Sequence, residues 1–376
     1  MLSGLKKNIQ DLSVHDKDHL QTQWVMGVPS IAKNQPNERI SYRLFPMWIA
    51  HKLEETPGYP QPVPKPRLPN LFHVKPAPGM DLGVFAKHDI KVHELIFAER
   101  PLVVYPTATL FSKGSTEVET YKKHVVDLEG SLKQVIKMMT PEDAKAFVTL
   151  HNRHKGSGEE LFGILRSNMI EVEIIKGEHE NEWSKYGAIG KVGSRFNHQY
   201  CSVIFFHRIF KNNLHLSSCN PGIRVAFDAQ SFSIKYIAVR DIKAGDQIFF
   251  SYCNSSLPAE ERRKQLETYG FSCQYTACVN ATPESDKLRE ELEERIGKLV
   301  QGRQAMLADP KFNVRSLDPL LKLEKDVMKE GLDARRCFPY LLRIILDGYV
   351  QLTNQKKTEE YAKKLFKTAP PGALSM

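Results

Sequence analysis

The sequence predicts an α+β fold, with small antiparallel sheets, a helical insertion and an all-helical C-terminal domain. Two observations lead to this prediction. Short β-rich runs separated by turn residues occur at 71–106 and again at 223–252, whereas apolar residues recur at helical spacing at about 112–185 and beyond residue 283. With 376 residues, 41% of them hydrophobic, the chain can bury one large core or two moderate ones.

Residues 1–70 are expected to form an N-terminal arm and linker. They combine weak amphipathic pieces with GYPQPVPKPRLPN, whose prolines exclude a continuous helix and favour an extended chain. From residue 71 onward, β-rich runs at 84–86, 95–98 and 102–105 predict a small antiparallel unit.

Helix signals dominate the insertion at about 112–185. Thr140 is a predicted N-cap, because Pro141 follows at the first helical position and Asp143 at the third. Residues 157–160, SGEE, repeat a capping signature before the apolar residues that begin at Leu161.

After this insertion the predicted elements return to strands and then to helices. IRVAFD, SFSIKYIAV and QIFFSY predict three strands, and AEERRKQLETYGF predicts a short helix that stops at Gly270. Beyond Pro283, one helix face carries Leu288, Leu292, Ile296 and Leu299, and a later one carries Leu341, Leu342, Ile345 and Tyr349. We expect these faces to serve helix–helix contacts alone.

Composition narrows the function classes. No apolar run approaches the roughly 18 residues that span a bilayer, and the N-terminus lacks a secretory apolar region. We therefore expect an intracellular protein, in the nucleus, the cytoplasm or both, with no membrane partner. The formal charge of +9 favours solubility over nucleic-acid binding, since no basic motif is interleaved with aromatic residues.

The motifs point away from several common enzyme classes. The sequence lacks four common motifs: HExxH, a Walker loop, GxSxG and a strand-to-helix GxGxxG. We therefore do not expect a zincin, a P-loop enzyme, an α/β-hydrolase or a Rossmann dehydrogenase. Instead, six short pieces occur in this order: GMDLGVFA, LRSNMIEV, FNH, SCNPG, AVRDIKAGDQIFFSY and YGFSCQYTAC.

This order of motifs resembles the SET-domain protein lysine methyltransferases, most closely the SET and MYND subgroup and its fungal relatives. The resemblance covers residues 71–280, and no MYND finger is expected because the helical insertion contains no cysteine. It implies a SET β-fold with a knot-like C-terminal segment, S-adenosylmethionine as cofactor, and a protein or peptide lysine as substrate, histone or non-histone. Residues 281–376 would then form a helical domain that walls the substrate cleft.

The same resemblance implies roles for individual residues. Tyr252 matches the catalytic tyrosine, whose hydroxyl faces the methyl group and the amine. Tyr269 matches a second aromatic residue that lines the lysine channel, and Phe271 matches the ring that packs on adenine. Asn197 and His198 match the pair that holds the cofactor through side-chain and backbone hydrogen bonds.

Further cofactor contacts are implied in the first half of the domain. Gly79, Leu82 and Gly83 match the loop that meets the methionine end of the cofactor. Asp81 replaces the middle glycine of that loop, and because Asp tolerates positive φ better than most residues, we expect the turn to form. Asn168 matches another cofactor-contacting Asn, with a capping or turn role as the alternative.

The cysteines match an incomplete zinc site. Cys219, Cys273 and Cys278 correspond to three of the four thiolates that would hold zinc tetrahedrally, and Tyr275 stands where the fourth is expected. Cys201, Cys253 or a histidine could substitute if the fold brings it near. The alternative is that Cys273 and Cys278 are reduced thiols packed in a loop.

One motif is split. If residues 199–217 are removed, the chain reads SRFNH-SCNPGIRVAFD, which restores the family's NHSCxP motif. One hypothesis is that these residues translate a retained intron, because T-rich non-coding sequence yields Phe, Ile, Val, Leu, Ser, Cys and Tyr. The other is a genuine surface loop, which would expose about six apolar side chains.

Two functions from different classes therefore stand side by side. The leading hypothesis is an S-adenosylmethionine-dependent protein-lysine N-methyltransferase. The rival is a degenerate SET module that acts as a protein-binding scaffold, its cofactor and zinc binding impaired by residues 199–217, Asp81 and Tyr275. Under the first, the acid-rich run at 284–294 could supply an acidic cleft for a basic peptide.

Overall fold

The computed structural model describes residues 24–27, 42–77, 81–106, 116–156, 158–174, 185–197, 221–267, 272–273 and 275–369. The chain divides into two compact units. The first comprises Met1–Pro69, Leu95–Arg195 and Val225–Tyr236, and the second comprises Asn70–Glu94, Phe196–Arg224 and Ile237–Met376. The boundaries predicted from sequence, 1–70, 71–280 and 281–376, stay a prediction.

A five-stranded sheet forms the centre of the first unit. Its order is β1-β2-β6-β8-β7, with bounds Trp24–Gly27, Tyr42–Pro46, Val103–Pro106, Lys185–Ile189 and Ile170–Glu173. β2 runs parallel to β6, and α2 (Met47–Glu54) follows β2 directly. The expectation of an extended arm is therefore corrected for residues 42–54, which form a paired strand and a helix. β2 pairs with β1 along Arg43–Pro46 and with β6 at Tyr42 and Arg43, and local sequence reveals neither partner.

A second sheet has the order β5-β10-β9, with bounds Leu95–Glu99, Ser233–Ala238 and Ile223–Asp228. These elements confirm three strands predicted from short β-rich runs. Tyr236 on β10 stacks on Phe97 of β5, with ring centroids 4.3 Å apart.

The predicted helical insertion contains α3 (Glu117–Met138), α4 (Pro141–Val148) and α5 (Glu160–Asn168). Thr140 is the N-cap of α4 as predicted, and its hydroxyl accepts the backbone N–H of Asp143 at 3.2 Å. The second capping prediction differs from the structure: the N-cap of α5 is Glu159, which makes no side-chain capping bond, while Ser157 lies outside the described residues. The helices end at Asn168, and β7 and β8 occupy part of the range predicted as helical.

The second unit contains a small antiparallel sheet of order β11-β4-β3, with bounds Gln247–Ile248, Leu82–Ala86 and Phe72–Pro76. Gln247 lies opposite Phe85, and Gly83 lies opposite Lys75. This sheet therefore brings the start of QIFFSY beside GMDLGVFA, two pieces that are far apart in the sequence.

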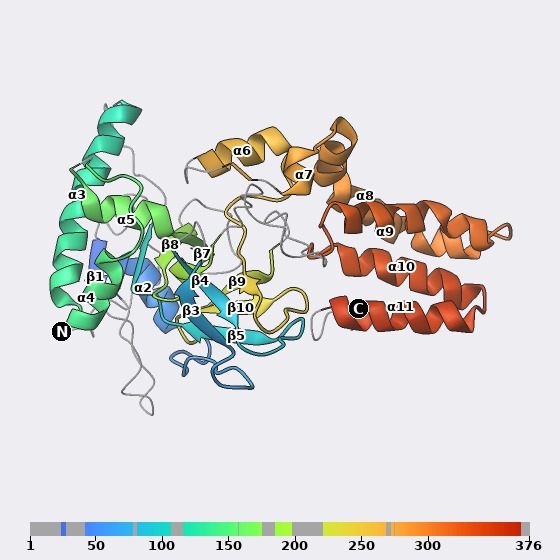
Figure 1. The fold of residues 1–376 in the computed structure, drawn as a ribbon, viewed down its shortest axis with the longest axis horizontal. Coiled ribbons are helices and arrows are strands. Elements are labelled where there is room, and N and C mark those ends of the chain that lie inside the picture. Colours follow the sequence, from blue (N-terminus) through green and yellow to red (C-terminus); the bar gives the residue numbers. More distant parts are fainter. Residues whose placement is uncertain are drawn as a thin grey trace, which may run out of the picture. The chain divides into compact units, whose positions relative to one another are not determined.

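The second unit also contains a series of helices (Figure 1). They are α6 (Ala259–Glu267), α7 (Thr276–Val279), α8 (Pro283–Ala308), η4 (Val314–Leu317), α9 (Asp318–Lys329), α10 (Phe338–Gln351) and α11 (Gln355–Thr368). The apolar positions predicted on α8 and α10 are buried in one core, with Leu299 partly buried against it, which confirms both stripes. Gly270, the predicted stop of α6, lies outside the described residues. Among the described helices, none has the length and apolar character that crossing a bilayer requires.

Candidate active site

One peptide group joins the two halves of the split motif. The N–H of Phe250 donates to the carbonyl of Asn197 at 3.1 Å, and the carbonyl of Phe249 accepts the N–H of Gly222 at 3.0 Å. The C=O and N–H groups of a trans peptide point in opposite directions. Asn197 and Gly222 therefore lie on opposite sides of the extended segment 249–250. The segments that end at Asn197 and begin at Gly222 therefore flank the same peptide group.

Without residues 199–217, the chain from Asn197 to Gly222 would still be long enough to cross the segment 249–250. His198 and residues 218–221 would then link Asn197 to Gly222, and six residue steps reach about 20 Å when extended. Two neighbours of a central strand lie about 10 Å apart, so this link suffices. Residues 199–217 lie outside the described residues, and both hypotheses about them stay predictions.

Tyr252 lies beside the same motif. Its hydroxyl donates to the carbonyl of Phe196 at 2.6 Å. Because the hydrogen is used in this bond, the phenolic oxygen presents its lone pairs as acceptors to other groups. The ring packs against a buried cluster that contains Cys253, Cys273 and Cys278. The tyrosine hydroxyl is thus held by the residue directly before Asn197.

Asn197 connects this group to the first motif. Its side-chain amide donates to the carbonyl of Leu82 at 2.9 Å. Gly83, the next residue, is surrounded so closely that an added Cβ would lie 2.4 Å from Nε2 of Gln247 and 3.1 Å from Nδ2 of Asn197. No side chain fits there without displacement, so glycine permits the close approach. The structure therefore brings together four predicted site residues, Leu82, Gly83, Asn197 and Tyr252.

Asp81 adopts the conformation that the turn requires. Its φ is +61°, in the left-handed region, and its carbonyl accepts the N–H of Ala77 at 2.8 Å. The prediction that Asp can replace the family's glycine without loss of the turn is confirmed. Its side chain is exposed.

Gln247 is a candidate that the sequence did not single out. Its Nε2 atom is buried and has no hydrogen-bond partner among the described residues, and it lies against Gly83. A buried donor without an acceptor is costly, so such an atom commonly marks the place of a ligand or water. Its position inside AVRDIKAGDQIFFSY was the available signal, but the motif alone does not show which way the side chain points.

The other predicted site residues are not part of this group as described. Asn168 belongs to the first unit, where its Nδ2 donates to the carbonyls of Ile164 and His151, both at 2.7 Å; the capping alternative accounts for these bonds. Five predicted residues lie outside the described residues: Gly79, His198, Cys219, Tyr269 and Phe271.

Three of the described cysteines, Cys253, Cys273 and Cys278, are buried in one cluster. The described part of the chain contains no group of three Cys, His, Asp or Glu that could hold a metal. The fully buried Arg262 donates from Nη2 to Sγ of Cys278 at 3.4 Å. Because Cys219 lies outside the described residues, the zinc site and the packed-thiol alternative both stay predictions.

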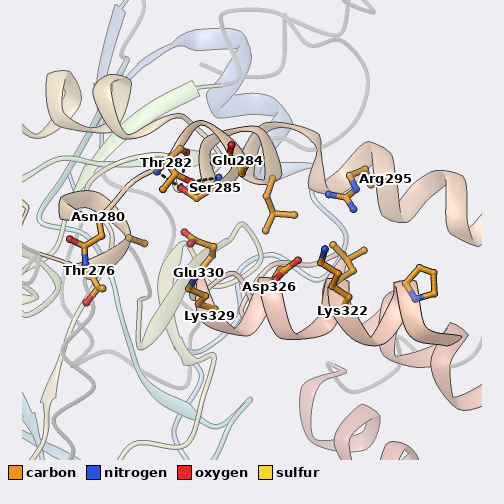
Figure 2. A pocket seen from close by; sticks show the side chains of 14 residues that line it. Thr276, Asn280, Thr282, Glu284, Ser285, Arg295, Lys322, Asp326, Lys329 and Glu330 are labelled. Carbon is orange, nitrogen blue, oxygen red and sulfur yellow. Dashed lines mark hydrogen bonds between the residues drawn. The ribbon is translucent and has the colours of Figure 1, made fainter. Parts of the chain in front are cut away.

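A cavity of about 600 Å³, lined by both polar and apolar residues, lies between α7, α8 and α9. Its labelled side chains come from these three helices and from their capping residues Asn280, Thr282 and Glu330 (Figure 2). Leu288 and Leu323 contribute apolar surface, and the charged residues that line it are three acids and three bases: Glu284, Asp326, Glu330, Arg295, Lys322 and Lys329. The charges balance, so this cavity is not an acidic cleft.

Three of the six acids in the run at 284–294 are paired with bases on the surface. Glu291 lies 3.8 Å from Lys287, Glu294 pairs with Lys298 at 2.5 Å, and Glu293 pairs with Arg335 at 2.7 Å. Exposed pairs contribute little stability, but each neutralises a carboxylate locally. The hypothesis that this run supplies an acidic cleft stays a prediction.

Comparison with known proteins identifies the domain that contains this group. Residues 81–253 match the SET domain, so the chain carries a SET domain, as the resemblance implied. The histone-lysine N-methyltransferase set5 of Schizosaccharomyces pombe is 25% identical over 209 residues, which cover 55% of this chain and 50% of the relative. Human histone-lysine N-methyltransferase SMYD3 is 33% identical over 85 residues, covering 22% and 19%.

The chain spans half or less of the length of these curated relatives. Among solved structures, the SET domain of LSMT bound to lysine and AdoHcy is similar at 11% identity with a TM-score of 0.26, over 87% of this chain and 93% of that one. This likeness is too weak to carry an argument about ligands.

Proposed function

We propose that this chain, which carries a SET domain, is an S-adenosylmethionine-dependent protein-lysine N-methyltransferase. One observation carries the proposal: Tyr252 is hydrogen-bonded to Phe196, the neighbour of Asn197, and Asn197 is bonded to Leu82. A hydroxyl, an amide and a glycine loop from three separate motifs thus form one group, as the resemblance implies for methyl transfer.

The residues present fit the cofactor. Gly83 offers backbone without a side chain, Asn197 fixes the loop, and the buried Nε2 of Gln247 is a donor without an acceptor. These residues would hold the amino-acid end of S-adenosylmethionine, whose carboxylate needs donors. When bound, the cofactor supplies a methyl group on a positively charged sulfur.

The substrate amine must be neutral to accept that methyl group. Free lysine has a pKa near 10.4, so roughly one molecule in a thousand is neutral at pH 7. Burial in an apolar channel disfavours the ammonium, and a shift of about three pKa units corresponds to about 4 kcal/mol. The phenolic oxygen of Tyr252, whose hydrogen is used on Phe196, is an acceptor that can orient an N–H of the amine.

The substrate lysine can belong to a histone or to another protein. The names of the relatives make a histone lysine the first substrate to test. A chain of formal charge +9 has no overall electrostatic attraction for a basic histone tail, and the balanced cavity between α7, α8 and α9 adds none. Non-histone lysines therefore belong in the same assay, and location in the nucleus or cytoplasm stays a prediction.

The rival scaffold function has lost part of its basis. Asp81 keeps the left-handed turn, and the hydrogen bonds around Tyr252 and Asn197 are intact. Tyr275 packs against the cysteine cluster, so the loss of a zinc ligand is compatible with a buried, ordered segment. These features favour an enzyme over a degenerate module.

Calorimetric titration with S-adenosylmethionine tests the proposal on two proteins, the full chain and a chain lacking residues 199–217. Both are also assayed for methyl transfer to histone and non-histone lysine peptides. We expect the shortened chain to bind and transfer, because five residues suffice to join Asn197 to Gly222. Binding only by the shortened chain would favour the retained-intron hypothesis. A folded shortened chain that binds no cofactor would favour the scaffold function and contradict the proposal.

A further inference from the structure

Glu99 is a buried carboxylate that the proposed chemistry does not use. It is the last residue of β5, and it is 8% exposed. Its Oε1 accepts the N–H of Gly193 at 2.7 Å, and its Oε2 accepts the N–H of Val192 at 3.0 Å. A carboxylate that accepts two backbone N–H groups holds that backbone strongly, because hydrogen bonds to a charged acceptor are about twice as strong as neutral ones.

Two glycines leave room for this carboxylate. A Cβ on Gly190 would lie 2.2 Å from Oε1 of Glu99, and a Cβ on Gly193 would lie 1.7 Å from the hydroxyl oxygen of Tyr236. Any side chain at either position would push the carboxylate or the tyrosine away. The turn that follows β8 is therefore built around Glu99.

Tyr236 completes the cluster. Its hydroxyl donates to Oε1 of Glu99 at 3.3 Å, its ring stacks on Phe97, and it is fully buried. Burial, followed by the negative charge of Glu99, raises the pKa of Tyr236 well above its ordinary value. Tyr236 therefore stays protonated and remains a donor to the carboxylate.

The segment that Glu99 holds leads directly into the candidate active site. Gly193 begins η3 (Gly193–Arg195), and the next residue is Phe196, whose carbonyl accepts the Tyr252 hydroxyl. We propose that Glu99 is a positioning residue for methyl transfer, which fixes the turn at 192–195 that directly precedes Phe196 and Asn197 in the chain. This inference rests on the proposed function.

The substitution Glu99→Gln tests the inference with little change in shape. The amide has one acceptor oxygen, so its NH₂ group faces one of the two backbone N–H donors and leaves it without an acceptor. We expect kcat to fall by about tenfold or more, because small misplacements of aligned groups slow transfer strongly. Backbone amide hydrogen exchange at 192–197 should become faster, while the KM for the peptide stays within about threefold.

Glu324→Gln is the matched control. Glu324 is also 8% exposed and also accepts a tyrosine hydroxyl, that of Tyr361, but in the C-terminal helices. We expect it to lower stability while leaving kcat and exchange at 192–197 unchanged. Equal loss of kcat in both variants, or normal exchange and kcat in Glu99→Gln, would overturn the inference.

A second variant and a second measurement cover the cases in which Glu99→Gln does not fold or the unsubstituted chain is inactive. If Glu99→Gln does not fold, the same measurements are made on Glu99→Asp, which keeps the charge but is too short to reach both N–H groups; unchanged exchange and turnover there would refute the inference. If the unsubstituted chain transfers no methyl group, the proposed function fails. Exchange at 192–197 then still shows whether Glu99 holds this turn.

Discussion

The surroundings of the Phe249–Phe250 peptide and the C-terminal helices are held together in different ways. Around this peptide, a few directional hydrogen bonds connect Leu82, Asn197 and Gly222, which come from three parts of the sequence. In α8 to α11, many apolar side chains share one core. Hydrogen bonds weaken steeply with misalignment, whereas apolar burial is non-directional. Substitutions in the first region should therefore change the reaction, and those in the second should change stability.

Leu341→Ala should have the largest effect, and on stability. Leu341 is fully buried on α10, and removal of its side chain from such a core costs about 2–5 kcal/mol in free energy of unfolding. Urea unfolding followed by circular dichroism measures the loss, with Leu341→Met as a control that keeps the volume and costs less than about 1.5 kcal/mol. A large fall in turnover under conditions where the variant is fully folded would contradict the division between the two regions.

Tyr252→Phe should have the opposite profile. It removes one hydroxyl and its bond to Phe196 but leaves the ring in place. We expect turnover to fall by about 100-fold, as on removal of one well-placed polar group at a reaction centre, with little change in the midpoint of unfolding. Affinity for S-adenosylmethionine, measured by calorimetry, should stay within about threefold. Retained turnover would show that Tyr252 is not the catalytic tyrosine.

Asn197→Asp should have the smallest effect of the three. The carboxylate keeps the shape of the amide but cannot donate to the carbonyl of Leu82, so two acceptors would face each other. A loss of about 1–3 kcal/mol is expected, seen as roughly 10-fold weaker cofactor binding with smaller changes in stability. The exposed Asn280, substituted in the same way, is the control. Unchanged cofactor affinity in Asn197→Asp would remove Asn197 from the binding site.

Some local features could be predicted from neighbouring residues alone. Thr140 caps α4, and the apolar stripes of α8 and α10 are buried, because capping and helix periodicity depend on residues three or four positions apart. Asp81 takes a positive φ for an equally local reason. By contrast, residues 42–46 become a strand because β1 pairs with 43–46 and β6 pairs with 42–43, and the residues next to this segment reveal neither partner.

The candidate site divides in the same way. The motifs named Leu82, Gly83, Asn197 and Tyr252 through resemblance, and their residue types already stated which groups could donate, accept or leave room for a ligand. Only the tertiary structure brings these groups together. It places the carbonyl of Phe196 against the Tyr252 hydroxyl, the buried Nε2 of Gln247 beside Gly83, and the Glu99 carboxylate against the turn at 192–195. Backbone carbonyls are present at every residue, so the sequence carries no mark of the few that the fold turns toward a functional side chain.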